Sequence, residues 1–185
     1  MRIVAGAWRG RGLIAPPGDT TRPTADRVRQ ALFDMLLHAP WGGRLDGLRV
    51  LDCFAGTGAL GLEALSRGAA YAIFIEQDRA ALAALRANIS SVGATDRCQV
   101  LAGNMLAIAR QSAEAACGLV FLDPPYGQDL VARGLAAATA AGLVSPGALV
   151  VAEVARDEPL ELPGSLLAER SHGAARITVW RLGDV

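Results

Sequence analysis

The feature that most constrains the fold is a regular alternation of short apolar segments and amphipathic segments, which starts at residue 48. The apolar segments predict strands at 48–52, 71–76, 98–101, 119–123 and 148–153. Helices are expected from the glycine-rich turn to about Arg67, between Asp78 and Gly93, at 105–115 and at 130–141. Near-continuous apolar strands in this order predict an α/β fold, with a parallel sheet that helices cover on both faces.

The two ends of the chain depart from this alternation. At the C-terminus, segments 166–170 and 176–182 flank a turn at His172-Gly173 and predict an antiparallel hairpin. At the N-terminus, we expect a small hairpin from 2–5 and 12–14, followed by a helix from Thr24 or Asp26 to about Leu37. Residues 1–43 therefore form a predicted extension, and residues 44–185 form the main domain.

Composition narrows the class of protein. The 185 residues carry no net charge, which argues against binding nucleic acid through the whole surface. The first thirty residues, however, hold six arginines and two aspartates. This excess of arginine predicts either a local basic patch that contacts phosphates or an N-terminal segment that is merely exposed to solvent.

Location and metal binding are also constrained by the sequence. No apolar run is long enough to span a bilayer, and the first residues lack the core of a signal peptide. Cys53, Cys98 and Cys117 are far apart and have no metal-ligand spacing. We therefore expect a cytoplasmic protein with reduced thiols and no metal site, and a monomer.

A glycine-rich loop follows the first predicted strand. Gly56, Gly58 and Gly61 match the GxGxxG pattern, which lets a ligand approach the backbone closely. That pattern is also compatible with a nicotinamide dinucleotide or with a tight turn that binds nothing. Asp52 just before the loop would repel a pyrophosphate, whereas with Glu76 it suits S-adenosylmethionine, whose amino group and sulfonium are positive.

The segment Asp123-Pro124-Pro125-Tyr126 follows the fourth predicted strand, at the edge where such sheets bind ligands. The prolines fix the backbone but keep their carbonyls as acceptors. Asp123 and the Pro124 carbonyl are expected to accept the two hydrogens of an exocyclic amine, while Tyr126 stacks on its base. The structural alternative is a Pro-Pro turn after a buried strand, with Asp123 capping a helix.

Together the two loops resemble the class I methyltransferases that modify amino nitrogens. The rest of the chain resembles one branch of them, the bacterial small-subunit ribosomal RNA guanine-N2 methyltransferases of the RsmD type. The resemblance runs nearly end to end and is most specific in residues 1–11, 22–33 and 51–69. It implies a Rossmann-like sheet of seven strands, with the C-terminal hairpin supplying the antiparallel strand.

The resemblance also implies roles for individual residues. Glu76 would hold the cofactor ribose, and Asn104 with Met105 would contact the adenine, although many relatives have Asp in place of Asn104. The implied cofactor-binding residues are Asp52, Phe54, Gly56, Gly58, Glu76, Asn104 and Met105. The implied RNA and substrate contacts are Arg9, Arg11, Arg22, Thr24, Arg27, Arg29 and Pro125.

The implied partner is 16S ribosomal RNA, which an assembling small subunit would present. Other functions stay open at this point. One is methylation of DNA amines or of a protein glutamine. DNA enzymes of this type usually carry an added recognition domain, and glutamine enzymes favour Asn at the position of Asp123. Another is an RNA-binding assembly factor without catalysis, and a weaker one is a dinucleotide oxidoreductase.

Overall fold

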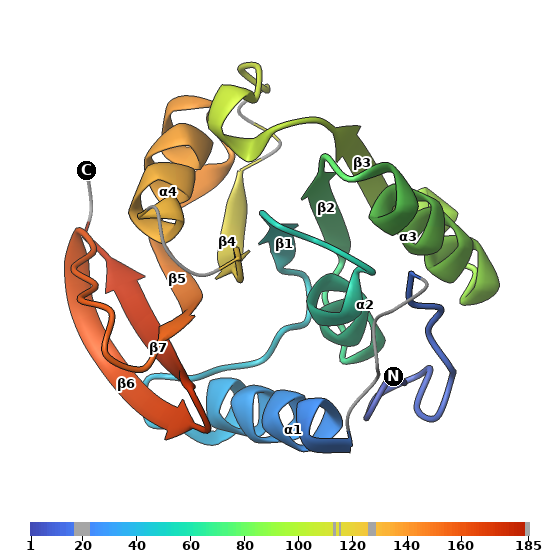
Figure 1. Cartoon of the computed structure of the whole chain (residues 1–185), viewed down its shortest axis with the longest axis horizontal. Coiled ribbons are helices and arrows are strands. Elements are labelled where there is room, and N and C mark those ends of the chain that lie inside the picture. Colours follow the sequence, from blue (N-terminus) through green and yellow to red (C-terminus); the bar gives the residue numbers. More distant parts are fainter. Residues whose placement is uncertain (17–22, 113, 115, 126–128, 184–185) are drawn as a thin grey trace.

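The computed structural model describes residues 1–16, 23–112, 114, 116–125 and 129–183, and of these the side chains of Pro23 and Thr24 are not described. One seven-stranded sheet runs through the molecule in the order β3-β2-β1-β4-β5-β7-β6 (Figure 1). Its strands are β1 (Arg49–Asp52), β2 (Tyr71–Glu76), β3 (Cys98–Ala102), β4 (Cys117–Leu122), β5 (Val144–Ala155), β6 (Gly164–His172) and β7 (Ala175–Leu182).

The strand pairing confirms the predicted α/β class. β1 to β5 pair in parallel, and β7 pairs antiparallel with both β5 and β6. The chain winds outward from β1 to β3, then returns to place β4 on the other side of β1. A topological switch point therefore lies between β1 and β4, where sheets of this kind bind ligands.

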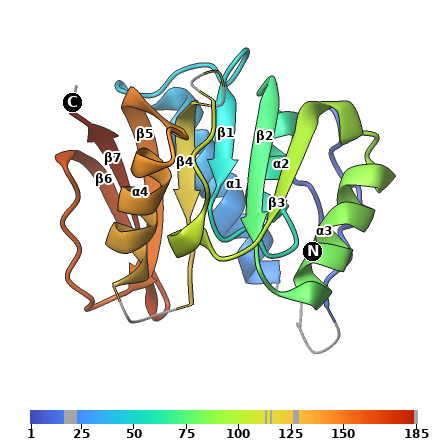
Figure 2. The ribbon, with the colours of Figure 1, turned by 90° about the horizontal axis from the view of Figure 1, so that it is seen from above.

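Helices cover both faces of the sheet, as predicted. They are α1 (Pro23–His38), α2 (Ala59–Ser66), α3 (Arg79–Ser91) and α4 (Leu130–Ala140), with short 3-10 turns at Thr95–Arg97 and Met105–Ala107. In Figure 2, α1 and α2 lie on the opposite face of the sheet from α4. Successive strand residues alternate between the two faces, so Val50 and Phe121 pack with the first three helices, whereas Leu51 and Leu122 pack towards α4.

The helix expected at 105–115 is wrong. Within its described part, only Met105–Ala107 form a 3-10 turn, and the chain then runs without regular structure to residue 112. Ile108 is extended, and the Gln111 amide donates to the carbonyl of Ala141. These contacts with the end of α4 override the local helix propensity.

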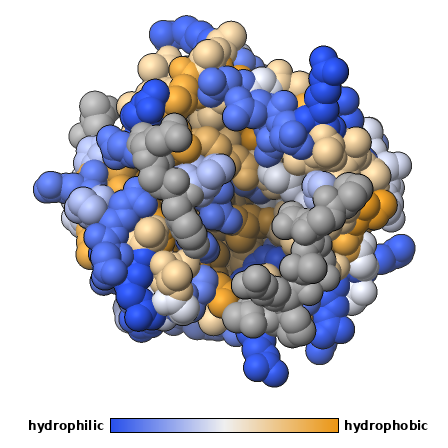
Figure 3. All heavy atoms as spheres, in the orientation of Figure 1, coloured by the Kyte–Doolittle hydropathy of each residue, from blue (hydrophilic) through white to orange (hydrophobic). Residues whose placement is uncertain are grey.

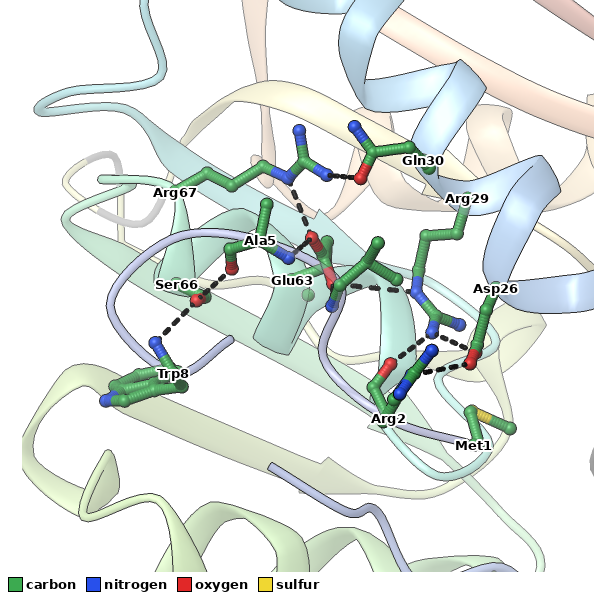
Figure 4. Close-up of polar contacts among 12 residues, drawn as sticks. Met1, Arg2, Ala5, Trp8, Asp26, Arg29, Gln30, Glu63, Ser66 and Arg67 are labelled. Atoms are coloured by element: carbon green, nitrogen blue, oxygen red, sulfur yellow. Dashed lines mark hydrogen bonds and ion pairs between the residues drawn. The ribbon is translucent and has the colours of Figure 1, made fainter. Parts of the chain in front are cut away.

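The N-terminal hairpin is less regular than expected, because it contains a single bridge between Arg2 and Gly12. Backbone hydrogen bonds also join Ile3 to Arg11 and Leu13 to Met1, and α2 holds this segment from outside, as Figure 4 shows. Glu63, which is fully buried, accepts from the amides of Val4 and Ala5 at 2.7 and 3.0 Å. The Ser66 carbonyl accepts from Ala7, and the Ser66 hydroxyl donates to Ala5.

The predicted division after residue 43 stays a prediction. Leu32, Phe33 and Leu36 of α1 belong to the same hydrophobic core as strands β1 and β4. The extension thus has no separate core among the described residues. None of the described helices is long and apolar enough to cross a membrane.

Candidate active site

The carboxyl edge of the sheet brings the predicted loops together around the switch point. Asp52 ends β1, Glu76 ends β2, and Asp123 follows β4. Gly56 and Gly58 have φ angles of 53° and 82°, in the left-handed region that favours glycine. A Cβ at Gly61 would overlap the ring of Phe74, so this glycine lets α2 pack closely on β2.

Asp52 is 2 % exposed and accepts from the Gly61 amide at 3.1 Å. Burial raises its pKa to about 7, the hydrogen bond from Gly61 opposes that rise, and the charge of Glu76 adds to it. A carboxylate held in this way is stabilised by a neighbouring cation. The site therefore suits a positively charged ligand group better than a phosphate.

Glu76 is fixed in position by backbone amides. One oxygen accepts from Gly56 at 2.7 Å, and the other accepts from Gln77 and Asp78 at 2.8 Å each. Asp78 in turn caps α3 by accepting from the Ala81 amide, as the sequence predicted. The carboxylate of Glu76 is thereby tied to the glycine loop before any ligand binds.

The other predicted cofactor residues lie around this edge. Asn104 caps the turn after β3, its side-chain oxygen accepting from Leu106 at 2.9 Å, and Met105 is 2 % exposed. Phe54 packs against Gly134 of α4. Asn104 can still accept a second hydrogen bond through the same oxygen.

Asp123 is solvent-exposed and lines the pocket at this edge of the sheet, where neighbouring protein partly desolvates its carboxyl group. Burial raises its pKa to about 7, and the charges of Glu153 and then Asp52 add to the shift. Pro124 is buried behind it and Pro125 is exposed. Tyr126, the predicted stacking residue, lies outside the described residues.

A pocket of about 360 Å³ opens beside Asp123, within the range typical of small-molecule sites. Figure 3 shows the surface hollowed near the centre of the view, with apolar residues inside the hollow. The walls are mostly apolar. The described lining is Met1, Ala25, Val28, Arg29, Leu32, Ala59, Leu60, Leu122, Asp123, Val151, Glu153, His172 and Ile177.

The predicted RNA contacts separate into two groups. Arg9, Arg11 and Arg27 are exposed, which is compatible with contact to phosphates. Arg29 is 6 % exposed and is ion-paired with Asp26 at 2.8 Å and with Glu63 at 3.6 Å. Both carboxylates hold Arg29, whose side chain also lines the pocket, and its contact with RNA phosphates stays a prediction.

Two predicted substrate residues cannot be placed. Arg22 lies outside the described residues, and so does the side chain of Thr24. Arg9 follows Trp8, which Ser66 anchors at the last turn of α2, whereas the pocket is lined by Ala59 and Leu60 at the first turn. The backbone next to Arg9 is thus held at the opposite end of α2 from the pocket.

Two pocket residues were not singled out from the sequence. Glu153 lies near the end of β5. The predicted strand 148–153 ends on this acidic residue, as the first two strands end on Asp52 and Glu76, and that similarity could have indicated it. His172, which the sequence predicts at the turn of the C-terminal hairpin, is half-buried, lines the pocket and lies 3.7 Å from Glu153. Only the pairing of β5, β7 and β6 brings these two side chains together.

Comparisons with known proteins agree with this geometry. The chain is 40% identical over 153 residues to an Escherichia coli protein named ribosomal RNA small subunit methyltransferase D, covering 83% of this chain and 74% of that one. A Haemophilus influenzae protein of the same name is 34% identical over 177 residues, covering 94% and 89%. The solved structure of the Escherichia coli protein yhhF superimposes with a TM-score of 0.83 at 36% identity, covering 100% and 99%.

A family model described as conserved hypothetical protein 95 matches residues 1–181. That match spans both the N-terminal extension and the sheet. The chain therefore belongs to this family, the RsmD-type methyltransferases that the sequence resembles.

Proposed function

We propose that this protein transfers a methyl group from S-adenosylmethionine to the exocyclic N2 of a guanine in small-subunit ribosomal RNA. Family membership makes it a ribosomal RNA methyltransferase, since curated relatives at 34–40% identity carry that name. The observation that carries the proposal is Asp123, held in a hollow beside a base-sized pocket and next to the buried Asp52.

The residues at the glycine loop fit the cofactor. Asp52 would face its positive amino-acid end, which the raised pKa of this carboxyl makes favourable. Glu76 would accept from the ribose hydroxyls, and Asn104 with Met105 would border the adenine. Open space around the Cα of Gly56 leaves room for the ligand against the backbone. When bound, S-adenosylmethionine supplies a methyl group on positively charged sulfur, an electrophile that needs no metal.

Catalysis then depends on how the chain holds the target amine. The nitrogen lone pair of guanine N2 is delocalised into the ring, so the free amine is a poor nucleophile. Hydrogen bonds from both N–H groups, one to Asp123 and one to the Pro124 carbonyl, favour a pyramidal nitrogen with a localised lone pair. Such positioning and electrostatic effects account for much of the rate in enzymes of many kinds.

The proton released by the methylated amine also needs an acceptor. Asp123 can take it, because a carboxyl with a pKa of about 7 exchanges protons readily near neutral pH. From the hollow, the proton passes to solvent. Tyr126 is proposed to stack on the base, an interaction typically worth about 1–3 kcal/mol.

RNA binding is proposed to involve the exposed arginines. Arg9, Arg11 and Arg27 would contact phosphates that flank the target, and Arg22, Thr24 and Pro125 would border the base. Phosphate contacts orient the substrate but carry little sequence information. The target guanine would have to leave its stack to enter the pocket, and an assembling small subunit is the proposed source of such a base.

The proposal is tested with Asp123→Ala. Transfer of labelled methyl to small subunits is measured for the wild type and the variant, and cofactor binding is measured by calorimetry. We expect at least 100-fold slower transfer by the variant, with an unchanged circular-dichroism spectrum and cofactor affinity within about threefold. Near-normal transfer by a folded variant would refute the role of Asp123.

A further inference from the structure

Glu153 lies beside Asp123 in the pocket but has no part in the mechanism so far. Leu122 of β4 pairs with Ala152 of β5, so Asp123 and Glu153 are the next residues on adjoining parallel strands. Leu122 and Ala152 pack towards α4, and alternation turns the following side chains to the opposite face, where the pocket lies. Strands in a sheet are about 4.8 Å apart, so the two carboxyl groups line one wall of the pocket.

The possible targets differ in what stands next to the reactive amine. In guanine, the N1–H donor is adjacent to the N2 amine on the Watson–Crick edge, so these two neighbouring groups are both donors. In adenine and cytosine, the ring nitrogen beside the amine is an acceptor, and in a glutamine side chain the neighbour is a carbonyl oxygen. A carboxylate placed next to the amine-binding group therefore attracts guanine and repels the other three.

We propose that Glu153 accepts the N1–H of the target guanine and thereby selects guanine over other amine-bearing bases. This inference rests on the proposed function, because it assumes that Asp123 holds the N2 amine. The apolar remainder of the pocket wall, including Val28, Val151 and Ile177, strengthens the discrimination. A polar mismatch is costly where water cannot replace the missing partner.

His172 acts as a positioning residue in this account. Its Nε2 lies 3.7 Å from a Glu153 oxygen, it ends β6 at the hairpin turn, and it lines the same pocket. The imidazole thus approaches Glu153 from the hairpin, and Asp123 lies beside Glu153 on the adjoining strand. The charges of Asp123 and Glu153 act on each other, and this repulsion is smaller where the Glu153 carboxylate turns towards His172.

The experiment compares two bases at the target position. Once the modified guanine has been mapped, small subunits are reconstituted with RNA that carries either guanine or 2-aminopurine there. 2-Aminopurine keeps the 2-amine but has an acceptor at N1. We expect the wild type to prefer guanine by at least 100-fold in kcat/KM.

Glu153→Gln keeps the shape of the side chain but replaces a charged, acceptor-only carboxylate with a neutral amide that has one acceptor oxygen and one donor nitrogen. We expect it to lose at least tenfold in kcat/KM on guanine and to reduce the preference over 2-aminopurine by at least tenfold. The matched control is Glu161→Gln, an exposed residue of the β5–β6 connection, which should leave both values unchanged. His172→Ala should reduce the preference about threefold, and His172→Gln should restore it.

The outcomes distinguish a failure of the proposed function from a failure of the role inferred for Glu153. If the wild type methylates no RNA guanine at all, both the proposed function and this inference fail. If it methylates guanine but accepts 2-aminopurine equally, or if Glu153→Gln leaves the preference unchanged, the inference alone is overturned.

Discussion

At the scale of single residues, the site consists of carboxyl groups whose environment makes them hard to ionise. Asp52 and Asp123 both have pKa values raised to about 7, chiefly by burial. Perturbed carboxyls of this kind cluster where enzymes bind charge or move protons. Here the two flank the place where a positive cofactor and a hydrogen-bond-donating base would meet.

The raised pKa of Asp123 predicts a pH profile. The ionised form accepts the amine hydrogen, so kcat/KM for RNA should fall as pH drops below about 7 and level off above about 8. Saturating cofactor keeps the titration of Asp52 from affecting the measured rate. A flat profile between pH 6 and 8 would contradict the role of Asp123.

Asp52→Asn should make the protein without cofactor more stable and should weaken cofactor binding. The pKa of Asp52 rises from 3.8 to about 7 on folding, so its ionised form destabilises the protein increasingly as pH rises through that interval. Without cofactor, the variant should be more stable at pH 8 by roughly 2–4 kcal/mol, and by less at pH 5. Cofactor affinity should fall at least tenfold.

Urea unfolding at both pH values measures the stability, and calorimetry measures the affinity. Asp96→Asn, at an exposed aspartate, is the control and should change neither. A variant that is less stable than the wild type at pH 8, or that binds cofactor normally, would contradict this account of Asp52.

At the scale of elements, the N-terminal segment forms part of the pocket rather than a loose end. Glu63 of α2 holds it through two backbone amides and also pairs with Arg67 at 2.7 Å and with Arg29 at 3.6 Å (Figure 4). Met1, at the end of this segment, lines the pocket. The buried carboxylate thus couples α1, α2 and the first residues of the chain.

Glu63→Ala should destabilise the protein by about 3–5 kcal/mol, because it removes the fully buried carboxylate that two buried arginine side chains share. The free energy of unfolding in urea measures this loss. Asp34→Ala removes a more exposed partner of Arg67 and should cost less than about 1 kcal/mol. Equal losses for the two variants would contradict a central role for Glu63.

Alanine substitutions at Gly6 and Gly10 test how closely the N-terminal segment packs against α2. Both have positive φ, of 80° and 84°, but a Cβ at Gly6 would overlap the Ser66 carbonyl, whereas a Cβ at Gly10 meets nothing within 4 Å. Gly10→Ala should cost about 1–2 kcal/mol from the backbone alone. Gly6→Ala should cost clearly more and should raise the KM for RNA. Similar losses would show that the segment is not held closely against α2.

The parallel strands could be predicted from apolar segments, because buried parallel strands have a composition of their own. The helix at 105–115 could not, since contacts with the end of α4 fix that segment in another form. Glu153 and His172 were missed for a related reason. Nineteen positions separate them in the sequence, and only the antiparallel pairing of β7 with its neighbours makes them adjacent.

At the scale of the whole molecule, a neutral protein is proposed to bind a polyanion through a local surface. Replacing Arg9, Arg11 and Arg27 with Ala should weaken RNA binding and reduce the salt dependence by about 0.7–0.9 per lost phosphate contact. Arg44→Ala, at an exposed arginine outside this segment, is the control. An unchanged salt dependence in the triple variant would place the RNA elsewhere.

The central claim, methyl transfer to N2 of guanine in small-subunit RNA, is tested most directly by identifying the product. Small subunits from a strain without this activity are incubated with the protein and labelled S-adenosylmethionine, and the RNA is digested to nucleosides for mass spectrometry. We predict label in N2-methylguanosine, and at least 100-fold slower labelling when Asp123→Ala replaces the wild type. Label in another nucleoside or in protein, or none with the wild type, would contradict the account.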